Sequence, residues 1–72
     1  MNEKIFTAKI KEILDNESVT MDSVLADIDE WDSLSAVSFM AFANSSCGKR
    51  IHPDKIWECK IVRDLYGLLT AE

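Results

Sequence analysis

Ser33 stands at the boundary between an acidic segment and an uncharged one: residues 29–32 read DEWD, whereas residues 33–48 carry no charge. One interpretation makes Ser33, or Asp32 before it, the N-cap of a helix, because both residue types accept hydrogen bonds from the first helical amides. The other makes Ser33 a modification site, because the free N–H groups and positive dipole end of a helix N-terminus suit an attached phosphate. The spacing alone favours the cap, although Ala36 stands where a capping box has Glu or Gln.

A catalytic serine would also need a neighbouring base and a group that orients this base. The only histidine is His52, which precedes Pro53, and we interpret it as a solvated loop residue. A chain of 72 residues has little room for an oxyanion pocket. We therefore expect the chain to be no enzyme and to have no catalytic residues of its own.

The candidate metal ligands have the wrong spacing. Residues 27–38 begin like a calcium loop but lack the glycine at its sixth position and the carboxylate at its twelfth. Cys47, His52 and Cys59 have a spacing that is unfamiliar for zinc. We expect no metal site, and we expect both thiols to be reduced.

Size and charge exclude further classes of function. We expect one domain, residues 1–72, with a thin core, because a domain this small buries only about 60% of the surface of its unfolded chain. The net charge of −5 argues against nucleic acid as a partner. There is no apolar run near the ~20 residues that cross a bilayer, and no signal-peptide pattern. We expect a complete, cytoplasmic, monomeric protein without membrane insertion.

The elements that must position Ser33 are helices. Apolar residues recur at helical spacing in four segments, residues 2–15, 33–47, 54–58 and 60–70. Gly48 is well placed to end the second helix. Residues 16–31 are expected to form a long loop that docks on the core, with a short turn at residues 22–26 and with Trp31 covering the core. These elements predict an all-α fold, a small four-helix bundle with a short third helix and a long first loop.

The second helix is expected to hold Ser33 at the surface by packing its apolar side against the core. Its buried side is predicted to consist of Leu34, Val37, Met40 and Ala43, widened by Phe39 and Phe42. Leu34 would then anchor the first turn in the core, while the hydroxyl of Ser33 stays exposed.

Two blocks of the sequence resemble the acyl carrier protein family. The first is Asp32-Ser33-Leu34 at the start of a helix that follows an amphipathic helix and a docked loop. The second, KIVRDL at residues 60–65, is similar to the K-T-V-x-D-L entry of carriers into their last helix. Ile51 and Asp54 also fall where carriers often have an isoleucine and an acidic residue. The resemblance covers essentially the whole chain, implies an acyl-carrier-like bundle and favours a free-standing carrier.

The resemblance implies that Ser33 receives 4'-phosphopantetheine from coenzyme A through a separate Mg²⁺-dependent phosphopantetheinyl transferase. Asp32 and Leu34 would help to form the site that the transferase recognises. The terminal thiol of the arm would hold acyl intermediates of fatty-acid, polyketide or other specialised acyl metabolism as thioesters. The other expected partners are acyl-loading and acyl-processing enzymes: a ligase, a ketosynthase or an acyltransferase.

The sequence also departs from the family pattern. Fatty-acid carriers have acidic residues along the exposed face of the second helix, but the corresponding residues here are neutral: Ser35, Ser38, Ala41, Asn44 and Ser45. Cys47 replaces the usual aromatic residue, and Ile61 stands where a capping threonine is common. The departures indicate a specialised carrier whose acidic loop steers its partners.

Two other interpretations remain open. A peptidyl or aminoacyl carrier would use the same serine for a different cargo, and an unmodified helical interaction module would use Ser33 only as a cap. In a carrier, an internal cavity between the helices, if present, would be lined by Val37, Phe39, Met40, Ile56 and Leu65. Since Phe39 and Phe42 would fill part of it, little cargo should be sequestered there.

Overall fold

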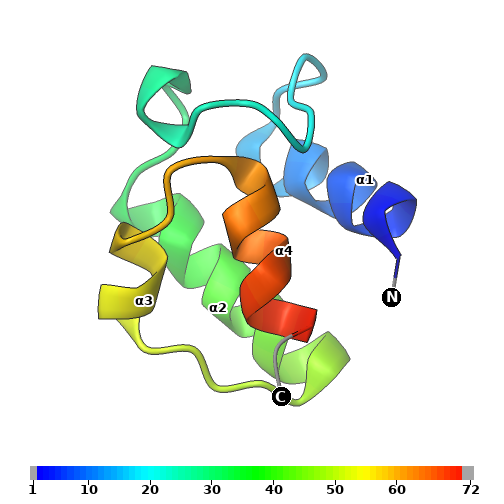
Figure 1. Cartoon of the computed structure of the whole chain (residues 1–72), viewed down its shortest axis with the longest axis vertical. Coiled ribbons are helices and arrows are strands. Elements are labelled where there is room, and N and C mark those ends of the chain that lie inside the picture. Colours follow the sequence, from blue (N-terminus) through cyan, green and yellow to red (C-terminus); the bar gives the residue numbers. More distant parts are fainter. Residues whose placement is uncertain (1, 71–72) are drawn as a thin grey trace.

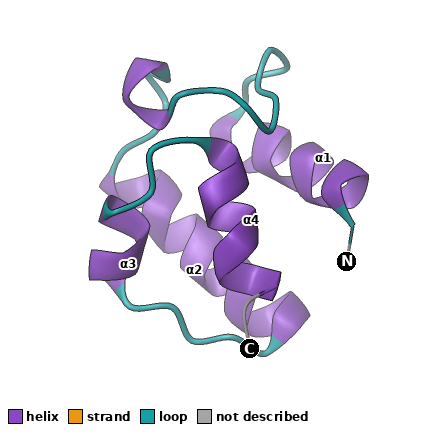
Figure 2. Ribbon diagram, viewed as in Figure 1, coloured by secondary structure: helices purple, strands orange, loops and turns teal. Residues whose placement is uncertain are grey.

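The computed structural model describes residues 2–70 and confirms the all-α prediction. Figures 1 and 2 show α-helices and a short 3₁₀ helix joined by loops, without a strand in the described part of the chain. The elements are α1 (Glu3–Leu14), η1 (Leu25–Asp27), α2 (Ser33–Cys47), α3 (Pro53–Trp57) and α4 (Val62–Thr70). Within residues 2–70, no helix has both the length and the apolar character that crossing a membrane requires.

Local sequence explains where α1 begins and where α2 ends. Asn2 is the N-cap of α1, and its side-chain oxygen accepts a hydrogen bond from the amide of Ile5 at 2.9 Å. Gly48 ends α2 in the left-handed conformation, at φ 64°, as the sequence predicts. Since this conformation is strained for residues with a Cβ atom, glycine favours the end of α2 at this position.

The core is centred on the ring of Phe6 in α1. This ring meets Phe39 of α2 edge-on, with centroids 6.2 Å apart, and lies 5.1 Å from the ring of Tyr66 in α4. Around it, the most completely buried side chains are Phe39, Ile10, Leu14, Val19, Leu25, Ile56, Val62 and Leu65. Every helix and the first loop contribute to this single core.

The loop between α1 and α2 docks on the start of α4, as Figure 1 shows. Backbone hydrogen bonds join the two segments: the amide of Leu25 donates to Lys60, and the amide of Val62 donates to Ser23, at 2.9 and 3.0 Å. The guanidinium of Arg63 adds ion pairs to α1 and to the loop, at 2.8 Å from Glu3 and 3.4 Å from Asp22. The predicted docking of this loop is therefore confirmed, and it positions the segment that leads into α2.

The prediction for the buried face of α2 is wrong in part. Leu34 and Val37 are 74% and 57% exposed, so Leu34 does not anchor the first turn in the core. The buried residues of α2 are instead Ser35, Ala36, Phe39, Phe42 and Ala43. Because α2 has no charged residue, no charged face marks its outer side. The two phenylalanines bury more apolar surface than leucine or valine would, and they set the rotation of the helix.

Candidate functional site

Ser33 is the first residue of α2, and its side chain is exposed. Asp32 is the N-cap: its Oδ1 accepts a hydrogen bond from the amide of Ser35 at 3.0 Å. Of the two caps that the sequence allowed, the structure therefore has Asp32. No side chain or backbone group of residues 2–70 forms a hydrogen bond with the hydroxyl of Ser33, which is accessible from solvent.

Ser35 ties the first turn of α2 to the preceding loop. Its side chain is buried, and its hydroxyl donates a hydrogen bond to the backbone carbonyl of Glu30 and lies 3.2 Å from Oδ1 of Asp32. The expectation that Ser35 lies on the outer face of the helix is therefore wrong. Ser35 stands three residues after Asp32, at the position whose backbone amide donates to an N-cap side chain. The amide contact could therefore be predicted from the cap, whereas the burial of Ser35 and the hydrogen bond of its hydroxyl could not.

The carboxylate of Asp32 is stabilised in its charged form. Its hydrogen bond from the amide of Ser35, and further bonds to this first turn, lower the pKa of Asp32, although partial desolvation opposes the shift. Asp29 and Glu30 are exposed beside it. The residues leading to Ser33 therefore present a negatively charged surface near neutral pH.

Apolar side chains are exposed next to this acidic surface. Leu34 follows Ser33, and Val37 lies one helical turn further along the same side of α2. Trp31 packs against the core and meets the ring of Trp57 in α3 edge-on, with centroids 6.1 Å apart and planes at 67°. Trp57 itself is 52% exposed. The expectation that Trp31 covers the core is confirmed, but its contact with Trp57 could not be read from the sequence.

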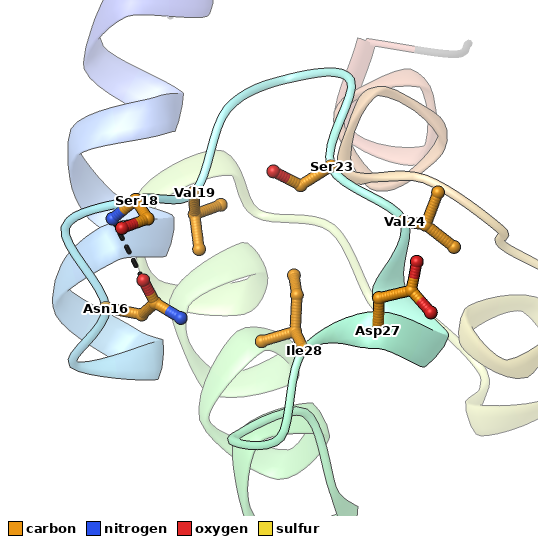
Figure 3. Close-up of a pocket in the computed structure, with 7 residues that line it drawn as sticks. All are labelled: Asn16, Ser18, Val19, Ser23, Val24, Asp27 and Ile28. Carbon is orange, nitrogen blue, oxygen red and sulfur yellow. Dashed lines mark hydrogen bonds between the residues drawn. The ribbon is translucent and has the colours of Figure 1, made fainter.

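A shallow hollow of about 230 Å³ lies within the loop between α1 and α2, and Ser33 does not line it. Figure 3 shows its lining: Asn16, Ser18, Val19, Ser23, Val24, Asp27 and Ile28. Two of its polar side chains are engaged within the loop, since Asn16 accepts a hydrogen bond from the amide of Ser18 at 2.9 Å and Ser23 accepts one from the amide of Thr20 at 2.8 Å. The hollow therefore resembles a packing feature of the loop and offers few free groups to a ligand.

The remaining reactive residues do not converge. His52 is exposed and caps α3, where its Nδ1 accepts a hydrogen bond from the amide of Asp54 at 3.2 Å. Cys47 and Cys59 are partly buried free thiols. Within residues 2–70, no three His, Cys, Asp or Glu side chains are grouped so that they could hold a metal ion.

Comparison of the chain with protein-family models, with curated proteins and with solved structures gave no match.

Proposed function

We propose that this protein is an acyl carrier that holds its cargo as a thioester on a 4'-phosphopantetheine arm attached to Ser33. The observation that carries the proposal is the division of roles at the start of α2. Asp32 caps the helix, so the exposed hydroxyl of Ser33 has no structural task. The resemblance of Asp32-Ser33-Leu34 and of residues 60–65 to carriers gives this hydroxyl its chemistry.

The attachment requires a hydroxyl that an enzyme can reach from outside. In the proposed reaction, the oxygen of Ser33 forms a bond to the phosphorus next to pantetheine, and the bond from this phosphorus to the adenosine 3',5'-bisphosphate of coenzyme A breaks. A base of the transferase takes the serine proton. Asp32 and Leu34 flank the hydroxyl and are both exposed, so a transferase can contact both while it acts on Ser33.

The outer face of α2 supports a carrier with specialised partners. Its exposed residues after the first turn are uncharged and include Ser38, Ala41, Asn44 and Ser45. Partner enzymes that read acidic residues along this helix would find none. The acidic loop before Ser33 is left to steer basic partner surfaces, an effect that raises association rates at low ionic strength.

The test is incubation of the purified protein with coenzyme A, Mg²⁺ and a broad-specificity phosphopantetheinyl transferase, followed by mass spectrometry of the intact protein. The wild type should gain one phosphopantetheinyl group and Ser33→Ala should gain none. Ser38→Ala is the matched control, because it removes another exposed hydroxyl of α2, and it should be modified like the wild type. An unmodified wild type would contradict the proposal and favour the helical interaction module.

The cargo class needs a second experiment on the modified protein. Loading by a ligase with a fatty acid would support the acyl carrier, whereas loading only by an amino-acid-adenylating enzyme would show the aminoacyl carrier. Both outcomes leave the role of Ser33 unchanged.

A further inference from the structure

We propose that the acyl group carried on Ser33 stays outside the helical bundle and lies on the exposed apolar surface around Ser33, formed by Leu34, Val37 and Trp57. This inference rests on the proposed function and specifies its cargo as an uncharged, apolar acyl group. It follows from a closed interior, an open apolar surface beside the attachment point, and the charge around that surface.

The interior is closed at the core residues that an acyl chain would have to separate in order to enter the bundle. Phe39, Ile56 and Leu65 are completely buried, and the ring of Phe6 fills the centre through its contacts with Phe39 and Tyr66. Three hollows at the surface are lined by the first loop, by α1 with Asp15 and Glu17 after it, and by α1 with α2, and Phe39, Ile56 and Leu65 line none of these three. A chain entering the bundle would have to separate close-packed side chains, which loses their contacts.

The surface around Ser33 is open and apolar. Val37 follows Ser33 by four residues and Leu34 by three, so these side chains are neighbours on one side of α2. Trp57 is brought to the start of α2 by its contact with Trp31, which precedes Ser33 by two residues. An arm attached to Ser33 would hold its acyl group near this surface at a high effective concentration, so the cargo is the occupant that we propose for it.

The charges favour one class of cargo. Residues 33–48 carry no charge, so an apolar chain can lie along α2 without desolvating an ion. Before Ser33 in the chain, the carboxylates of Asp29, Glu30 and Asp32 are exposed, and they repel an acyl group that ends in a carboxylate. Each methylene group that becomes fully covered multiplies the docked population by up to about fourfold. The effect should therefore grow from acetyl to butanoyl to octanoyl and be weak for malonyl.

Trp31 and Trp57 are the only tryptophans of the chain and serve as built-in reporters. The four acyl forms are made from acetyl-, butanoyl-, octanoyl- and malonyl-coenzyme A with the same transferase, and intact mass confirms loading of each. We expect octanoyl to shift tryptophan emission to shorter wavelength, to reduce its quenching by acrylamide, and to move the indole N–H signal of Trp57 in ¹H–¹⁵N spectra. The methyl signals of Ile56 and Leu65 should stay in place.

Two variants, each of which replaces an exposed aliphatic side chain by serine, complete the test. Val37→Ser removes an apolar side chain from the surface around Ser33, whereas Ile5→Ser removes one of nearly equal exposure, 56%, from α1. Val37→Ser should lose most of the octanoyl-dependent response, and Ile5→Ser should keep it.

The outcomes separate the two proposals. Absence of any mass gain overturns the proposed function and this inference with it. Complete loading accompanied by shifts of Ile56 and Leu65 overturns the inference alone, because the cargo is then inside. Complete loading with no change at Trp57 also overturns it alone; if Trp57 then responds to added transferase, the surface receives a partner protein instead.

Discussion

The carboxylate of Asp32 accepts a hydrogen bond from the backbone amide of Ser35, with 3.0 Å between nitrogen and oxygen. This contact caps the start of α2 without using the hydroxyl of Ser33. The hydroxyl of Ser35 donates a second hydrogen bond, to the backbone carbonyl of Glu30. The first turn of α2 is therefore joined both to its N-cap and to the preceding loop. An exposed serine consequently stands at a helix start that two hydrogen bonds hold in place. This arrangement suits a group that must be presented to other proteins in a fixed position.

The cap makes a first prediction about stability. Asp32→Ala should lower the free energy of unfolding by about 1 kcal/mol, whereas Asp32→Asn, which can still accept the hydrogen bond, should have a smaller effect. Urea denaturation followed by circular dichroism measures both variants. Equal losses in the two variants would show that charge, rather than capping, is what Asp32 contributes.

The pH dependence of stability follows from Asp32 and Asp64. Hydrogen bonds from the amides of Lys60 and Ile61, at 2.9 and 3.2 Å, lower the pKa of Asp64, and the amide of Ser35 lowers that of Asp32. A group whose pKa is lower in the folded state stabilises the protein above its unfolded pKa, and the contribution disappears as pH falls through the folded value. Stability should therefore decline below about pH 4.

The control for this decline is the double variant Asp32→Asn, Asp64→Asn, which keeps side-chain oxygens but removes both titrations. Its free energy of unfolding should fall less steeply than that of the wild type over the same acidic range. A decline of the same slope in both proteins would assign the effect to other carboxylates.

Much of the fold could be predicted from the sequence because its signals are local. The bounds of α2, the end at Gly48 and the docking of the first loop follow from turn residues and apolar spacing. The helix start at Asp32 and Ser33 follows from the same signals, whereas the roles of Ser33, Asp32 and Leu34 in a carrier come from the resemblance to acyl carrier proteins. The burial of Ser35 and the exposure of Leu34 were not predictable, because α2 has no charged side that would fix its rotation and serines lie on both of its sides. The packing of α2 against the other helices determines which of its residues are buried.

The rotation of α2 can be tested by two substitutions. Phe39→Ala should lower the free energy of unfolding by about 3–5 kcal/mol, because it opens a cavity at a buried ring. Val37→Ala, at an exposed position, should change it by less than about 0.5 kcal/mol. Thermal or urea denaturation gives both values. A large loss for Val37→Ala would mean that the side chain is buried in solution, as the sequence pattern predicts.

Ser35 should matter more for stability than its size indicates. Ser35→Ala leaves the carbonyl of Glu30 without its side-chain donor, and a lost hydrogen bond of this kind lowers the free energy of unfolding by about 1 kcal/mol. Faster hydrogen exchange of the amides near the start of α2 should accompany the loss. Ser38→Ala, on the exposed side of the same helix, should change neither quantity; an equal effect there would deny Ser35 a special role.

The thiol of Cys59 should react unusually slowly in the folded protein. Burial raises its pKa to about 11, and the negative charges of Asp64 and Glu58 act in the same direction. Because the thiolate is the reactive form, a rise of about two pKa units from the ordinary value of 9.0 leaves roughly a hundredfold less thiolate at pH 8. In Cys47→Ala, where Cys59 is the only thiol, alkylation by iodoacetamide should be slower by this order in the native state than in urea. Its native rate should rise about tenfold per pH unit up to the shifted pKa. Equal rates in native protein and urea would show that Cys59 is accessible and carries no raised pKa.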